Sequence, residues 1–186
     1  INKYIFKKEM KFNGLTEYFG KINNKKTFML MRGENFSVVP ITTHINPKYI
    51  YKVFDKNFKD FINELIFILK KNNFKKIKFL CYSPHCGENG TIGNEDIILK
   101  KVLYKYSDID GPYPADSAFK NFNSKTVYIS LYHDQALIPF KILNKKSVNM
   151  TLGLNYRRIS PAHGTAKDII GKGIADNTSY IQCMLI

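Results

Sequence analysis

The stretch that decides the fold is residues 47–82, PKYIYKVFDKNFKDFINELIFILKKNNFKKIKFLCY. From Pro47 onward, apolar residues recur at steps of three and four, and this spacing predicts one amphipathic helix ending near Asn72 and Asn73. The apolar positions are Ile50, Val53, Phe54, Phe58, Phe61, Ile62, Leu65, Ile66 and Leu69. The run from Lys75 to Tyr82 is short and rich in apolar residues, which predicts a strand.

Strand and helix signals alternate on both sides of this stretch. The other predicted strands are residues 26–31, 36–43, 126–132 and 147–152, the first two forming a hairpin across the turn-prone residues 32–35. The other predicted helices are one capped by Asn94 and ending near Lys105, a short one within residues 163–176, and one opening at Asn177. Residues 111–116, GPYPAD, predict a turn. This alternation predicts an α/β or mixed fold around one core, and we treat residues 1–186 as one unit.

The net charge of +14, from 29 Lys and Arg against 15 Asp and Glu, first suggests a nucleic-acid or anionic-membrane partner. Only three of the basic residues are Arg, the residue type that contacts phosphates and bases with two donors at once: Arg32, Arg157 and Arg158. The lysines are spread along the whole chain, which indicates a solvated surface. No apolar run approaches the roughly 20 residues of a membrane-spanning helix. We therefore expect neither nucleic acid nor a membrane as a partner.

The three cysteines, Cys81, Cys86 and Cys183, fit neither a disulfide framework nor a CxxC zinc site, so we expect a cytoplasmic protein. The chain begins INKYIFKKEM, which lacks the features of a signal peptide, and ends NTSYIQCMLI, which opens like a helix and has no cap residue. We therefore expect the chain to be part of a longer protein.

All four histidines lie in compact polar or glycine-containing segments at expected strand ends or loops. They are His44 in ITTHINP, His85 in SPHCGENG, His133 in YHDQA and His163 in PAHGTA. Active sites of α/β folds gather at strand ends, and three neutral imidazoles on one ion form a common catalytic metal site. The spacings between the first three histidines are long, however, so the residues alone do not identify a metal site.

Five segments occur in an order that is far more specific than any one of them: PHCGENGTIGNED, GPYPADSAF, YHDQALIPFK, VNMTLGLNYRRISPAHGTA and IIGKGIAD. Through them the chain resembles the 4-hydroxythreonine-4-phosphate dehydrogenases. The last segments also resemble the cofactor loop of the wider isocitrate and isopropylmalate dehydrogenase superfamily. The resemblance implies that superfamily's α/β fold, a mixed sheet flanked by helices, without the family's N-terminal part.

The resemblance also implies an activity. Members oxidise 4-phosphooxy-L-threonine with NAD or NADP and a divalent metal ion, for which zinc, magnesium and cobalt are the candidates. The 3-oxo acid then loses carbon dioxide to give 3-amino-2-oxopropyl phosphate, in pyridoxal 5'-phosphate biosynthesis. The resemblance further implies a homodimer with the active site at the subunit interface.

Site residues follow from the same resemblance, residue by residue. The implied metal ligands, drawn from both protomers, are His44, His85 and His133. The implied substrate contacts, whose chemistry suits a phosphorylated amino acid, are Thr16, Lys141, Asn149 and Arg158. The groups expected to move a proton, orient a histidine or stabilise developing charge are Asp116, Asp134 and Lys141. The expected dinucleotide contacts are His163, Gly164, Thr165 and Asp176.

Several of these residues also have plainer interpretations. Asp116 could be a turn residue after a proline, and Asp134 a strand-end cap. Gly171 and Gly173 could form a helix cap and turn, and we interpret Cys86 as a small buried residue.

Leu15 departs from the family, which has a substrate-binding histidine at this position. Leucine can neither donate a hydrogen bond nor carry charge. This departure keeps open a related dehydrogenase acting on a phosphorylated sugar acid such as D-threonate 4-phosphate. Two other classes remain as alternatives: a nucleic-acid-binding module, suggested by the charge, and an inactive truncated fragment that only folds or dimerises.

Overall fold

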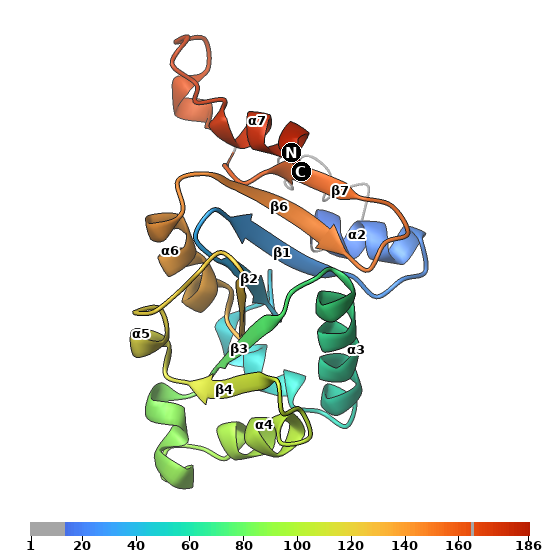
Figure 1. The fold of residues 1–186 in the computed structure, drawn as a ribbon, viewed down its shortest axis with the longest axis vertical. Helices are drawn as coiled ribbons and strands as arrows, with labels where there is room; N and C mark the ends of the chain where they lie inside the picture. Colours follow the sequence, from blue (N-terminus) through green and yellow to red (C-terminus); the bar gives the residue numbers. More distant parts are fainter. Residues whose placement is uncertain (1–13, 165) are drawn as a thin grey trace.

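A seven-stranded mixed sheet runs through the computed structural model, which describes residues 14–164 and 166–186 (Figure 1). The strands are β1 (Phe28–Gly33), β2 (Ser37–Pro40), β3 (Lys76–Leu80), β4 (Ile109–Tyr113), β5 (Thr126–Ser130), β6 (Ser147–Leu152) and β7 (Arg158–Pro161). Their order in the sheet is β4-β3-β5-β2-β1-β6-β7. Strands β4, β3, β5 and β2 are parallel neighbours, whereas β1, β6 and β7 continue the sheet in antiparallel pairs.

Helices cover both faces of this sheet. The α-helices are α2 (Leu15–Ile22), α3 (Phe58–Lys71), α4 (Glu95–Leu103), α5 (Ala115–Ala118), α6 (His133–Leu143) and α7 (Thr178–Leu185). Three shorter helical segments are η1 (Pro47–Val53), η2 (Pro84–Gly90) and η3 (Lys167–Ile169). The predicted α/β class, with a mixed sheet flanked by helices, is confirmed. None of the helices in the described residues is both long and apolar enough to cross a membrane.

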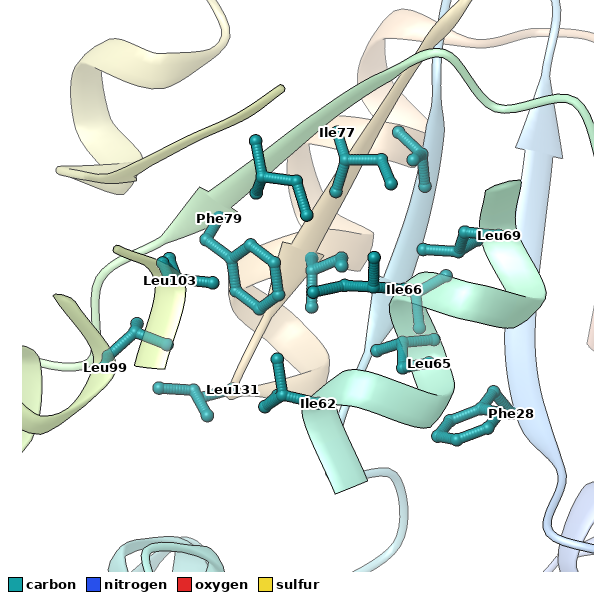
Figure 2. Packing of buried hydrophobic residues seen from close by; sticks show 14 of the residues in the cluster. Phe28, Ile62, Leu65, Ile66, Leu69, Ile77, Phe79, Leu99, Leu103 and Leu131 are labelled. Carbon is teal, nitrogen blue, oxygen red and sulfur yellow. The ribbon is translucent and has the colours of Figure 1, made fainter. Parts of the chain in front are cut away.

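Alternating side chains of each strand enter two separate cores, because successive residues of a strand point to opposite faces. In β1, Phe28 and Leu30 belong to the core that contains the buried face of α3, whereas Met29 and Met31 belong to the core that contains the buried face of α6. Figure 2 shows the first of these cores, where α3 inserts Ile62, Leu65, Ile66 and Leu69 against the sheet. Each fully buried Leu or Ile contributes about 1.5–3 kcal/mol to folding. Packing in these two cores fixes the positions of the strand ends that carry the site.

The single helix predicted from Pro47 is wrong in its first part. η1 ends at Val53, and α3 begins only at Phe58. Between them the Asp55 carboxylate accepts a hydrogen bond from the backbone N–H of Asn57, at 2.8 Å. A short polar side chain that bonds the nearby backbone competes with helix formation, so the apolar period continues through a break in the helix. The predicted hairpin, the strands near 75–82, 126–132 and 147–152, and the helix opening at Asn177 are confirmed.

Helices α2, α5 and α6 and strands β4 and β7 were not predicted. The segment predicted as a turn, residues 111–116, instead ends strand β4 and begins α5; β4 lies at the edge of the sheet, where proline is tolerated. α6 contains Pro139, a residue that usually breaks helices. β7 had no signal, and the helix predicted within residues 163–176 is only the three-residue η3.

Asn94 occupies the N-cap position of α4 as predicted, but its side chain makes no capping hydrogen bond. Asp96, in the first turn of α4, accepts hydrogen bonds from the backbone N–H groups of Tyr82 and Ser83, at 2.6 and 2.8 Å. These bonds fix the start of the loop that follows β3 and carries His85.

Candidate functional site

Four parallel strands point their carboxyl ends to one edge of the sheet, and a predicted site residue follows each strand. His44 follows β2, His133 follows β5, His85 follows β3 and Asp116 follows β4. Ligand sites of open α/β sheets lie at this edge. The topology therefore explains why histidines far apart in the sequence gather on one side of the molecule.

A cavity of about 570 Å³ opens at the β2 and β5 end of this edge. Eight of the predicted site residues line it: Thr16, His44, His133, Lys141, Asn149, Arg158, His163 and Gly164. They come from α2, the loop after β2, α6, β6, β7 and the loop after β7. The structure thus brings predicted metal, substrate and nucleotide residues together in one place.

His44 and His133 face each other in this cavity, with ring centres 6.0 Å apart. Neutral imidazoles are common ligands of divalent metal ions, so two rings this close together in one cavity could contribute to one metal site. His133 Nδ1 is 2.8 Å from Asp134 Oδ1, which leaves Nε2 available. A carboxylate on the far nitrogen is the usual partner of a metal-binding histidine. Asp134 lies in the first turn of α6, so it is not the strand-end cap that its plainer interpretation predicted.

The cationic and polar wall of the cavity is built around Arg158. Its Nη1 donates a hydrogen bond to Thr151 Oγ1 at 3.2 Å, and its guanidinium lies 5.4 Å from the centre of the Phe19 ring. Thr151 Oγ1 is also 3.4 Å from Thr16 Oγ1. Burial lowers the pKa of Arg158. A half-buried cation of this kind favours an anionic ligand, because an anion would compensate its lost hydration.

Asn149 adds an acceptor to the same wall. Its Oδ1 is buried and has no hydrogen-bond partner among the described residues. Since leaving such an atom unpaired costs about 1–3 kcal/mol, a ligand that donates a hydrogen bond here would be favoured. Lys141, exposed on α6, supplies a second positive charge at the mouth of the cavity.

His85 lies outside this cavity. It borders a second hollow of about 510 Å³ together with Cys86, Glu88 and Lys100. Residues 85–89 form a left-handed turn, with positive φ angles between 44° and 72°. His85 Nδ1 is 3.0 Å from Glu88 Oε1, and this hydrogen bond raises the pKa of the histidine. Within residues 14–164 and 166–186, no group of three or more His, Cys, Asp or Glu side chains could hold a metal ion.

Asp116 is exposed, and its charge adds to the effect of Glu88 in raising the pKa of His85; it does not line the cavity that contains His133. Cys86 is half buried, with Sγ 3.4 Å from the carbonyl oxygen of Pro112, in agreement with its interpretation as a small packed residue. Burial raises its pKa to about 12. Such a thiol is inert near neutral pH.

The predicted nucleotide residues cluster after β7. His163 and Gly164 are exposed at the cavity. Hydrogen bonds from Thr178 lower the pKa of the Asp176 carboxyl, and the electrostatic effect of His163 lowers it further. A Cβ atom on Gly164, Gly171 or Gly173 would meet nothing within 4 Å, so this backbone is open to an approaching ligand. Gly171 and Gly173 have positive φ angles, which favour glycine. Thr165 lies outside the described residues.

Two carboxylates beside the histidines were missed in the sequence. Glu88 partners His85, and Glu17 lines the cavity next to His44. Glu88 lies three residues after His85, a weak signal in a loop. Glu17 directly follows Thr16, which was singled out, but nothing in the sequence places it near His44.

Comparison with known proteins supplies a family context for this geometry. Residues 1–186 match the family described as pyridoxal phosphate biosynthetic protein PdxA. The 4-hydroxythreonine-4-phosphate dehydrogenase of a Hydrogenobaculum species is 39% identical over 193 residues, which cover 97% of this chain and 61% of the relative. The Aquifex aeolicus protein of the same name is 35% identical over 202 residues, covering 99% of this chain and 61% of that relative.

A solved structure agrees with these relatives. The crystal structure of 4-hydroxythreonine-4-phosphate dehydrogenase from Klebsiella pneumoniae superposes with a TM-score of 0.75 at 27% identity, covering 100% of this chain and 62% of that chain. The chain therefore spans about 60% of the length of the curated relatives that it matches.

Proposed function

Because the chain belongs to the family of the pyridoxal phosphate biosynthetic protein PdxA, we propose that it serves the oxidation of 4-phosphooxy-L-threonine by NAD or NADP. A divalent metal ion is required, and the 3-oxo acid formed loses carbon dioxide to give 3-amino-2-oxopropyl phosphate, in pyridoxal 5'-phosphate biosynthesis. The observation that carries the proposal is one cavity that combines two facing imidazoles, Lys141, the half-buried Arg158 and the unpaired Asn149 acceptor.

Lys141 and Arg158 bind the anionic groups of the substrate, its carboxylate and its phosphate. Asn149 Oδ1 accepts a hydrogen bond from the substrate ammonium or hydroxyl group, which satisfies the buried oxygen. Thr16, anchored to Thr151 and thereby to Arg158, donates a hydrogen bond from the same wall. After oxidation, Lys141 stabilises the negative charge that develops as carbon dioxide leaves.

His44 and His133 would hold the metal ion, and Asp134 keeps the proton of His133 on Nδ1. When bound, the ion would supply Lewis acidity toward the substrate hydroxyl, and the nicotinamide would supply the hydride acceptor. His85 faces a separate hollow in the same chain. We assign it to the site of a second copy in a homodimer, where Glu88 orients it and Asp116 adds a second negative charge and is the candidate group to move a proton.

The nucleotide binds beside β7, against His163, Gly164 and the open glycine backbone that leads to Asp176. Thr165 belongs to the same proposed contact set. We place the protein in the cytoplasm, because all three cysteines are free thiols.

The test is NADH or NADPH formation by the intact protein with 4-phosphooxy-L-threonine and added Zn²⁺, Mg²⁺ or Co²⁺. His133→Ala should abolish metal-dependent turnover, and unchanged activity would overturn the metal assignment. Lys141→Ala should lower kcat/KM strongly. The matched control, Lys145→Ala, removes an equally exposed lysine beyond the same helix and should not.

Leu15 supports a second candidate substrate. It lines the cavity, and its side chain offers only apolar surface there. A phosphorylated sugar acid such as D-threonate 4-phosphate carries no ammonium group. It therefore requires other polar contacts than 4-phosphooxy-L-threonine does. The ratio of kcat/KM for the two substrates separates the candidates.

A further inference from the structure

Glu17 lies in the first turn of α2 and reaches the loop that carries His44. Its Oε1 accepts a hydrogen bond from Thr43 Oγ1 at 2.6 Å. Its Oε2 is buried and has no hydrogen-bond partner in the described part of the chain. A buried carboxylate oxygen is costly without a partner, so its position needs an explanation beyond the contact with Thr43.

Gly14 shows where that oxygen lies. A Cβ atom built on Gly14 would be 2.5 Å from Glu17 Oε2 and 2.9 Å from both Nδ1 and Cε1 of His44. The carboxylate oxygen and the Nδ1 edge of the imidazole therefore approach the same point, which only glycine leaves empty. The φ angle of Gly14 is −166°, an extended conformation open to any residue, so the constraint on this position is space rather than backbone strain.

Each of the other two candidate metal histidines has a carboxylate oxygen at Nδ1. His133 Nδ1 is 2.8 Å from Asp134 Oδ1, and His85 Nδ1 is 3.0 Å from Glu88 Oε1. In both pairs the carboxylate comes from the same short segment as the histidine. Glu17 differs because it comes from another element, α2, and is placed beside His44 by the fold.

We propose that Glu17 is a positioning residue for His44. Its carboxylate lies beside the Nδ1 edge of the imidazole and favours the tautomer with the proton on Nδ1, in which Nε2 carries the lone pair for a divalent cation and is more basic. Gly14 keeps the space between the two groups clear. The inference rests on the proposed function, since it takes His44 as a metal ligand. Glu17 acts through the imidazole and not as a ligand itself, since among the described residues no three such groups could hold an ion together.

The test is the Co²⁺ dissociation constant of the intact protein, measured by calorimetry, together with the visible absorption spectrum of bound Co²⁺. Glu17→Gln keeps the size of the side chain and an acceptor for Thr43, but removes the charge beside His44. It should weaken Co²⁺ binding roughly 10- to 100-fold and change the spectrum. Glu64→Gln, the same substitution at a half-exposed carboxylate paired with Lys26, is the matched control and should change neither.

Gly14→Ala provides a second variant, because the added methyl group pushes the carboxylate and the imidazole apart. It should weaken Co²⁺ binding by a similar factor, and Glu17→Gln decides the question if Gly14→Ala does not fold. Co²⁺ affinity within twofold of the unaltered protein in Glu17→Gln, combined with loss of Co²⁺ binding in His44→Ala, would overturn the positioning role alone. Unchanged Co²⁺ binding in His44→Ala would instead overturn the metal site of the proposed function.

Discussion

Arg158 is the residue whose replacement tests the substrate pocket most directly. Its guanidinium is half buried against Thr151 and Phe19, and none of the ion pairs within the described residues includes it. A hydrogen bond to a charged group contributes about 1.5–3 kcal/mol, which corresponds to about 10- to 150-fold in affinity. Arg158→Gln should therefore weaken binding of 4-phosphooxy-L-threonine by this factor, measured by calorimetry at fixed ionic strength.

The stability of the ligand-free protein should respond much less. Arg158→Gln removes the hydrogen bond to Thr151 and the contact with Phe19, each of which contributes about 1 kcal/mol or less. It also removes a partly dehydrated cation, which works in the opposite direction. We expect the free energy of unfolding in urea to change by no more than about 1 kcal/mol.

The neighbouring Arg157 provides the control, because it is exposed and donates to the backbone carbonyl of Ile186, outside the cavity. Arg157→Gln removes the same charge and should leave substrate affinity within about twofold, the size expected of a screened surface charge. Equal losses of affinity in the two variants would show that net charge, rather than a specific contact of Arg158, attracts the substrate. That result would refute the reasoning.

Three further predictions concern the core, the thiols and the cavity wall. Leu65→Ala should lower the free energy of unfolding by about 2–5 kcal/mol, whereas Phe67→Ala, on the exposed side of the same helix, should change it by no more than about 1 kcal/mol. Because burial raises the pKa of Cys86 to about 12, roughly one Cys86 thiol in 10,000 is ionised at pH 8. Alkylation of Cys86, followed by mass spectrometry, should therefore be about 1,000-fold slower than in the urea-unfolded protein. Its rate should increase about tenfold per pH unit between pH 7 and pH 9. Leu15→His should lower KM for 4-phosphooxy-L-threonine by about 2- to 10-fold, the effect of one added hydrogen bond. Leu15→Ala is the control. A KM that stays equal or rises in Leu15→His would contradict a substrate contact at this position.

The parts of the fold that could be predicted are those in which apolar spacing and local structure agree. The helix over Phe58–Lys71 shows this agreement, since its apolar period of three and four matches the face buried in the core. Two of the missed elements contain a proline that contradicts the local context. β4 tolerates Pro112 only because it is an edge strand, and α6 tolerates Pro139 within a helix packed on the sheet. Edge position and packing are tertiary properties, which no local pattern carries.

The candidate site divides in the same way. Histidines at strand ends could be found from the sequence because parallel strands gather their carboxyl ends at one edge. The carboxylate beside His44 could not, because Glu17 and His44 come from different elements and approach each other only where Gly14 leaves space. A partner contributed by another element depends on packing geometry, whereas Asp134, directly after His133, is visible in the sequence.

The position of His85 follows from the loop that carries it, and it bears on how the metal site is completed. β3 lies next to β5, so a short loop after β3 could have brought His85 beside His133. Instead, Asp96 fixes the start of the loop against α4, and the left-handed turn at residues 85–89 packs toward α4 and β4. A left-handed backbone costs roughly 1–2 kcal/mol at each residue other than glycine, so these contacts must hold the turn in place. A loop fixed in this way presents His85 away from the cavity of its own chain, which is the placement that the proposed homodimer requires.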